Sequence, residues 1–257
     1  MGDGAGGDGT AVRDLALRAD ETEAWLLARF ASHAVLRGVE ELEQRAFLEL
    51  LLQRRFLSLL FAVMYDAGID GLADDAAIAL VREILREEYP DPSGGTPSHR
   101  EDLVHDLLVL GATRAQVLAA RPTVVTASVV EETLGIMLDA AAAGDDVGVL
   151  TILRFWGEVL VSIEYGAFWR RMGAAFDAAG VASRFYEPHH HHDGAEPLAL
   201  ASDASTTHSG RLGACLARLL VGDAGCEEFA RVERRVLDAR VRFYDQFLAP
   251  SPSGETS

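Results

Sequence analysis

The stretch 149–179 is apolar on all sides of a helix, and this feature limits the fold most. Its centre, residues 159–163, is Val-Leu-Val-Ser-Ile. A helix that is apolar all round must be buried by other elements. No segment of the chain alternates apolar and polar residues with the period of a strand. The covering elements are therefore expected to be helices, which predicts an all-α bundle.

Glycine, proline and capping residues divide the remaining chain into helical segments. Ser98, followed three residues later by Glu101, is a capping box and predicts a helix start. One helical domain is expected over residues 13–249, flanked by segments 1–12 and 250–257, whose Gly, Asp, Ser and Pro content predicts disorder. The other predicted helices cover 22–33, 39–67, 74–89, 98–109, 114–119, 125–143, a His-rich segment, 212–220 and 227–248.

Composition excludes several classes of function. The 257 residues carry a net charge of −17, which argues against nucleic acid or an anionic membrane surface as a partner. The two cysteines, Cys215 and Cys226, are interpreted as ordinary thiols rather than a disulfide framework or a zinc site. We find no signal segment and no apolar run of membrane-spanning length. A soluble cytoplasmic protein is expected.

The segment 185–196 holds four of the eight histidines, in one run at 189–192. Carboxylates flank the run on both sides. On a helix, His189, Asp193 and Glu196 project from one face. Imidazole and carboxylate are ligands of iron, manganese and zinc, so the pattern favours a metal site. The competing interpretation is a solvated polar loop.

Carboxylates and a histidine also fall on the apolar faces of neighbouring helices. Glu88 continues the apolar stripe that includes Leu85, and Glu87 continues the adjacent stripe as a competing choice. His99 lies one turn before Leu103, on the apolar face of the next helix. A buried carboxylate is costly unless it is paired or binds a metal.

Glu164 directly follows the most apolar part of 149–179, which makes it a candidate metal ligand. Its alternative role is an ion pair with Arg170 or Arg171. We assign Glu158 to the less hydrophobic side of the helix, near Arg154. Carboxylates and histidines from separate helices predict a carboxylate-bridged two-metal site inside the bundle.

Three segments in this order resemble the haem-oxygenase-like di-iron oxidase/oxygenase superfamily: 86–103, 157–168 and 185–196. The family pattern is a helix ending in Glu, a His soon after, a Glu on a central helix, and His-x-x-x-Asp-x-x-His on a third. The resemblance spans about residues 40–248 and implies a seven-helix haem-oxygenase-like scaffold that binds two irons instead of haem. The ligands it implies are Glu88, His99, Glu164, His189 and Asp193.

The sequence departs from this pattern at the last ligand. Glu196 stands where the family has histidine, and Pro197 pushes it away from helical geometry. His208, beyond a polar stretch that looks inserted, is the alternative. The sixth ligand is therefore Glu196, His208 or neither, and Glu196 is slightly favoured.

The resemblance implies an enzyme with two Fe(II) ions as cofactor and O2 as co-substrate. Such enzymes oxidise amino acids or fatty acids by N-oxygenation, desaturation, cyclisation or C–C cleavage, here expected in natural-product biosynthesis. We favour a small amino acid, because no uninterrupted apolar channel for an acyl chain is visible. Arg170, Arg171 or Arg184 is a candidate for binding its carboxylate, with surface charge as the alternative role.

Two other classes of function stay open. The same scaffold serves metal-free enzymes, namely thiaminase-like hydrolases with a Cys nucleophile and a cofactorless oxidase. The other class is a non-catalytic interaction protein with a metal-buffering His patch. The apolar helix 125–143 is a candidate homodimer face.

Overall fold

Every regular element in the described residues, 6–192 and 195–248, of the computed structural model is helical. The elements are α1 (Gly6–Ala31), α2 (Ala34–Arg37), η1 (Val39–Glu41), α3 (Gln44–Gly71), α4 (Asp75–Glu87), α5 (His99–Val109), α6 (Arg114–Ala119), α7 (Val124–Ala143), α8 (Asp146–Arg154), η2 (Phe155–Val159), α9 (Leu160–Ala179), α10 (Tyr186–His192), α11 (His208–Leu219) and α12 (Gly222–Asp245).

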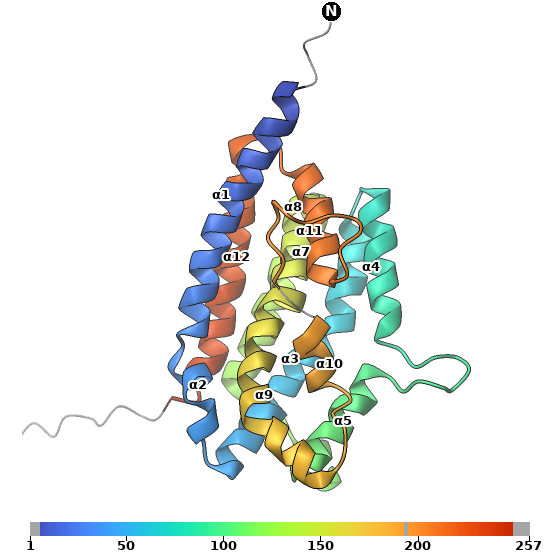
Figure 1. Cartoon of the computed structure of the whole chain (residues 1–257), viewed down its shortest axis with the longest axis vertical. Helices are drawn as coiled ribbons and strands as arrows, with labels where there is room; N and C mark the ends of the chain where they lie inside the picture. The colour runs from blue at the N-terminus through green and yellow to red at the C-terminus, as the bar shows by residue number, and fades with distance from the viewer. Residues whose placement is uncertain (1–5, 193–194, 249–257) are drawn as a thin grey trace, which may run out of the picture.

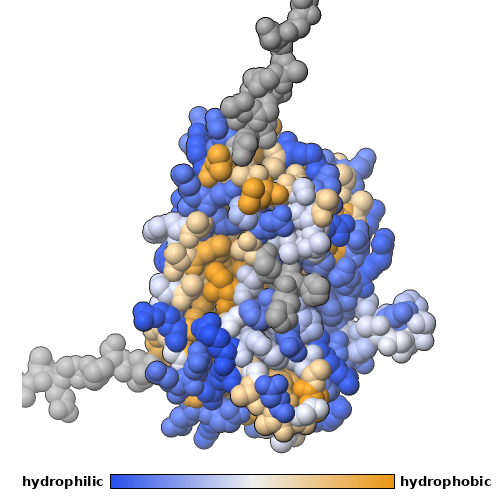
Figure 2. Space-filling view, in the orientation of Figure 1, coloured by the Kyte–Doolittle hydropathy of each residue, from blue (hydrophilic) through white to orange (hydrophobic). Residues whose placement is uncertain are grey.

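Helices α1 and α12 lie side by side along one edge of the bundle, and α4 and α5 lie on the opposite side (Figure 1). Between them, α8 packs against α7, α11 and α12, and α3 packs against α7 and α4. The visible face is largely hydrophilic, with apolar residues gathered in a few patches (Figure 2). No helix in the described ranges is both long enough and apolar enough to cross a membrane.

The central segment α8–η2–α9 is buried, as its all-round apolar character predicts, but it is not one regular α-helix. Leu150, Phe155 and Leu160 are completely buried. Residues 155–159 form a π-helical turn between α8 and α9. A π-turn holds an extra residue and shifts the phase of everything that follows it, and such turns are frequent at functional sites.

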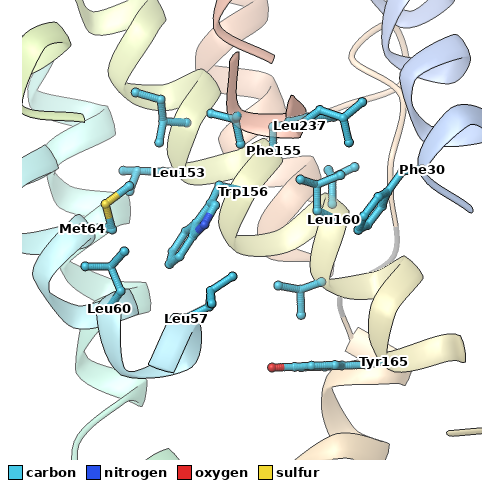
Figure 3. Close-up of a cluster of buried hydrophobic side chains, with 14 of the residues drawn as sticks. Phe30, Leu57, Leu60, Met64, Leu153, Phe155, Trp156, Leu160, Tyr165 and Leu237 are labelled. Atoms are coloured by element: carbon cyan, nitrogen blue, oxygen red, sulfur yellow. The ribbon is translucent and has the colours of Figure 1, made fainter. Parts of the chain in front are cut away.

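The hydrophobic core gathers around this segment. In Figure 3, Leu57, Leu60 and Met64 of α3 approach the segment from one side, and Phe30 and Leu237 approach from the other. All five side chains are buried, with at most 6% exposed. The core thus holds the central segment between α3 and the α1–α12 pair.

The helix ends that matter most for the site are those around the loop 88–98. Ser98 caps α5 as predicted: its hydroxyl accepts from the amide of Glu101 (3.3 Å), and the Glu101 carboxylate accepts from the amide of Ser98 (2.9 Å). His99 is consequently the first residue of α5. Glu88 is the C-cap of α4, so the helix ends at this carboxylate.

At the N-terminus, α1 begins at Gly6, whereas the sequence predicted disorder up to residue 12 and a first helix at 22–33. Extending an existing helix costs much less than nucleating one, so α1 continues through a polar segment. Residues 1–5 and 249–257, including the predicted tail 250–257, lie outside the described ranges.

Candidate active site

A cavity of about 520 Å³ opens between α3, α4, α5, η2–α9 and the helices α10, α11 and α12. Its walls are mainly apolar and aromatic. Leu57 of α3 and Trp156 of η2 lie next to each other, with Tyr165 of α9 below them in Figure 3, and all three line the cavity. Its acidic and imidazole side chains come from five helices and their ends: Glu87, Glu88, His99, Glu158, His189 and His208.

Glu88 and His99 form the first pair of these side chains. The Oε1 atom of Glu88 lies 2.7 Å from Nδ1 of His99, across the loop that joins α4 to α5. Burial lowers the pKa of His99, but the hydrogen bond and negative charge of Glu88 outweigh it, so the pKa is raised. The two ligands predicted for this region are brought together.

His189 of α10 lies against this pair. Its ring centroid is 4.9 Å from that of His99, and the rings meet edge to face. Nδ1 of His189 is 2.6 Å from the carbonyl oxygen of Phe185. Because a carbonyl only accepts, Nδ1 carries the proton, and in the neutral ring the lone pair lies on Nε2. In this tautomer the imidazole can bind a metal through Nε2.

Asp106 of α5 fixes the start of α10 and thereby positions His189. Its completely buried carboxylate accepts hydrogen bonds from the hydroxyl of Ser183 (2.6 Å) and from the backbone amides of residues 184–186 (3.0–3.1 Å). A carboxylate at a helix N-terminus accepts hydrogen bonds from the unpaired amides of the first turn, and its negative charge interacts favourably with the helix dipole. Asp106 thus positions a candidate site residue, and the sequence analysis missed it.

A second group of side chains surrounds His208, the first residue of α11. Its Nε2 lies 3.3 Å from Glu87, and its Nδ1 lies 3.6 Å from Glu158. Tyr65 donates a hydrogen bond of 2.6 Å to the other oxygen of Glu158. Burial lowers the pKa of His208, but Glu158 outweighs it and the pKa is raised. Both side chains that the sequence left as alternatives, Glu87 and His208, thus line the cavity.

Glu158 occupies the position that the sequence analysis expected for Glu164. It is buried, lies in η2 and lines the cavity. Assigning it to a less hydrophobic face assumed a regular helix through 149–179, and the π-turn removes that assumption. The sequence did contain a sign that Glu158 is buried, because a carboxylate within a segment that is apolar all round is buried on whichever face it lies.

Glu164 does not line the cavity. It is completely buried between two arginines, accepting from Nε of Arg54 (2.8 Å) and from NH1 of Arg240 (2.6 Å). Burial raises the pKa of Glu164, but the two guanidinium groups outweigh it, so the pKa is lowered. The ion-pair alternative named the wrong partners, because Arg170 and Arg171 bind Glu40 instead.

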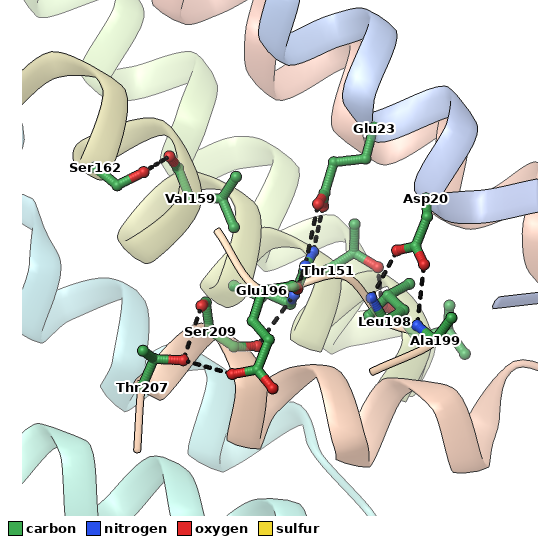
Figure 4. Close-up of polar contacts among 12 residues, drawn as sticks. Asp20, Glu23, Thr151, Val159, Ser162, Glu196, Leu198, Ala199, Thr207 and Ser209 are labelled. Carbon is green, nitrogen blue, oxygen red and sulfur yellow. Dashed lines mark hydrogen bonds and ion pairs between the residues drawn. The ribbon is translucent and has the colours of Figure 1, made fainter. Parts of the chain in front are cut away.

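Glu196 also lies away from the cavity. Its carboxylate accepts hydrogen bonds from the hydroxyls of Ser205 (2.7 Å) and Thr207 (3.1 Å) near the start of α11. Its carbonyl accepts from Arg154 (2.7 Å), in the polar cluster of Figure 4. The remaining predicted ligand, Asp193, lies outside the described residues.

Among the side chains that the structure describes, no three of His, Cys, Asp or Glu are close enough to hold one metal ion. The cavity carboxylates and imidazoles instead contact one another in pairs. Both cysteines are buried, burial raises the pKa of each thiol, and neither lines the cavity. The cavity therefore presents carboxylate and imidazole chemistry without a thiol nucleophile.

No protein-family model matches the chain, and no curated protein matches it either. Solved structures do. A TenA homologue protein from P. horikoshii matches with a TM-score of 0.57 and 16% identity over 91% of this chain and 97% of that chain. A TenA family transcription regulator from Silicibacter sp. matches with a TM-score of 0.58 and 17% identity over 91% of this chain and 97% of that one.

A CADD-like protein of unknown function from Nostoc punctiforme gives a TM-score of 0.61 with 13% identity, over 93% of this chain and 94% of that chain. TenA-like and CADD-like proteins share the haem-oxygenase-like helical fold. The predicted fold class is therefore confirmed. At these identities the similarity shows the fold alone, and the function must be argued from the site.

Proposed function

We propose that this chain is an O2-dependent non-haem di-iron oxidase that acts on a small amino-acid-like substrate. The observation that carries the proposal is the gathering of three glutamates and three histidines around one apolar-walled cavity. Glu158 is buried among them, and a buried carboxylate is costly unless it is paired or binds metal.

The donor set fits iron by its chemistry, since imidazole and carboxylate are the ligands of non-haem iron. Glu88, His99 and His189 would have to move closer together to hold one ion, with Asp193 as the further ligand that the sequence supplies. Glu158, His208 and Glu87 would have to do the same to hold the second. Glu158 thus takes the role that the sequence analysis gave to Glu164. Two Fe(II) ions bound there would supply the activation of O2.

The surrounding residues orient these donors. Tyr65 holds one oxygen of Glu158 through its hydroxyl, and the Phe185 carbonyl holds the ring of His189. Contacts of this kind set the direction and basicity of a ligand. Leu57, Trp156 and Phe185 line the cavity and would keep water from the oxidant.

The electron balance requires a reductant. Removal of two hydrogen atoms from a substrate supplies two electrons, whereas reduction of O2 to two water molecules takes four. A one-electron donor such as ferredoxin, or ascorbate in the test tube, would supply the other two electrons, and two protons would come from solvent. The substrate would leave as the desaturated product.

A metal-free enzyme is the second candidate, favoured by two observations. The fold neighbours include TenA-labelled proteins, and the cavity donors contact one another in pairs. A thiaminase-like mechanism needs a cysteine nucleophile, and neither Cys215 nor Cys226 lines the cavity. The geometry therefore disfavours this branch and leaves a cofactorless oxidase as its remaining form.

The test is an anaerobic Fe(II) titration followed by an O2 pulse with ascorbate and a panel of amino acids. The wild type should bind two irons per chain and consume O2 faster with one substrate. Glu158→Gln and His189→Ala should lose iron, whereas Glu131→Gln, on the exposed face of α7, is the matched control and should bind normally. The proposal would be contradicted if the wild type bound no iron, or if both cavity variants bound iron as the wild type does.

A further inference from the structure

Two buried arginines, Arg54 of α3 and Arg240 of α12, line the cavity and share one carboxylate. Arg54 is 2% exposed and Arg240 is 1% exposed. Their shared partner, Glu164, is completely buried behind the cavity wall and does not line it. The wall therefore carries two positive charges, balanced by a single negative one.

Arg240 is the less completely hydrogen-bonded of the two arginines. Its NH1 binds Glu164 (2.6 Å) and its NH2 binds the carbonyl of Trp156 (3.1 Å). Its Nε is buried and has no hydrogen-bond partner among the described residues. Burial lowers the pKa of Arg240, and repulsion from Arg54 lowers it further, while Glu164 opposes both.

Tyr244 does not balance this charge. It lies beside Glu164 and both arginines, and it stays neutral because burial raises its pKa well above the ordinary value. A buried charge without a counter-ion is strongly unfavourable, so an anion in the cavity would be stabilised here.

We infer that Arg240, together with Arg54, binds the carboxylate of the small amino-acid-like substrate, whose apolar body fills the cavity. The inference rests on the proposed function and names the residues that recognise the substrate's carboxylate. A planar guanidinium matches a carboxylate with two parallel hydrogen bonds. Leu57, Phe61, Trp156 and Val161 supply the apolar contact surface for the body.

Other arginines suit this role less well. Arg170 and Arg171 are tied to Glu40 and do not line the cavity, and neither does Arg184. Arg100 lines the cavity but is exposed, so water screens its charge. A volume of about 520 Å³ is within the range for one small ligand.

The test compares hexanoate with hexanamide, which differ in charge but hardly in shape, by calorimetric titration into chelator-treated protein. Hexanoate should bind about 10-fold more tightly or better, as expected when a charge-assisted hydrogen bond is replaced by a neutral one. Arg240→Gln should abolish this preference, and Arg240→Lys should keep part of it. Arg170→Gln is the matched control and should behave as the wild type does.

Equal binding of the two ligands by the wild type would overturn the inference without relying on any variant. So would a folded Arg240→Gln protein, checked by circular dichroism, that retains the preference for hexanoate. Iron titration keeps the two proposals apart. If the protein binds two irons but shows no preference for hexanoate, only the carboxylate site is contradicted. If it prefers hexanoate but binds no iron, only the di-iron function is contradicted.

Discussion

Tyr65 of α3 donates a hydrogen bond of 2.6 Å to Glu158 in the π-helical turn, and both side chains are buried. The bond joins α3 to the carboxylate that the π-turn directs into the cavity. It therefore couples the packing of the core to the orientation of a candidate ligand.

Tyr65→Phe removes this hydrogen bond and leaves a buried carboxylate oxygen without its donor. The free energy of unfolding should fall by about 1–2 kcal/mol. Iron affinity should fall by roughly 10–100-fold, as is typical when a residue that orients a ligand is lost. Urea denaturation and anaerobic Fe(II) titration measure the two effects. Unchanged iron affinity would show that Tyr65 does not orient a ligand.

Asp106→Asn replaces an acceptor-only group by an amide whose NH2 faces the donors of residues 183–186. We expect a loss of about 3 kcal/mol in stability and faster amide hydrogen exchange over 184–186, because α10 loses its N-terminal anchor. Asp66→Asn, on an exposed part of α3, is the matched control. Slow exchange at 184–186 in Asp106→Asn would contradict this role.

Arg154→Met leaves Glu23 buried without its counter-charge. Arg154 binds Glu23, with one contact at 3.1 Å. It also donates to the backbone carbonyls of Glu196 (2.7 Å) and Ser209 (3.1 Å). Glu23, Glu196 and Ser209 are labelled in Figure 4. Breaking a fully buried pair costs about 3–5 kcal/mol, measurable by urea denaturation.

The same substitution at an exposed pair provides the control for Arg154. Arg18 pairs with Asp223 at 2.7 Å on the surface, where solvent screens the interaction. Arg18→Met should leave the unfolding midpoint unchanged. Equal losses in the two variants would mean that burial does not determine the strength of the Arg154 pair.

Glu233 of α12 should make the protein less stable as the pH rises. Burial and repulsion from Glu23 and Asp20 raise its pKa well above the ordinary value, and Arg154 only partly opposes them. Above about pH 4.5 the unfolded chain releases this proton while the folded chain keeps it, so stability falls until the folded pKa is passed.

Glu233→Gln removes this dependence. The variant should gain at least about 1 kcal/mol over the wild type at pH 8 and little at pH 4, since one unit of pKa difference equals about 1.4 kcal/mol. Urea denaturation across this pH range measures the difference. A gain of the same size at both pH values would point to packing rather than ionisation.

Local patterns predicted the helices well where the determinants are neighbours in sequence. The capping box at Ser98 placed the start of α5, and α6 has the predicted ends. The same patterns placed Glu88 and His99 near each other, because only a short loop separates them. The observed helix starts differ from the predicted ones where a helix continues through residues of low helix propensity, as in α1 and α11.

The chain by itself determined an all-helical bundle around one buried central segment, because periodicity and apolar content depend on local spacing. The tertiary structure alone decided which carboxylate of that segment enters the cavity. The π-turn moved Glu158 inward, and Glu164 was taken up by Arg54 and Arg240, which lie 110 and 76 residues away in sequence. Partners so distant are chosen by helix packing, and no local pattern encodes that choice.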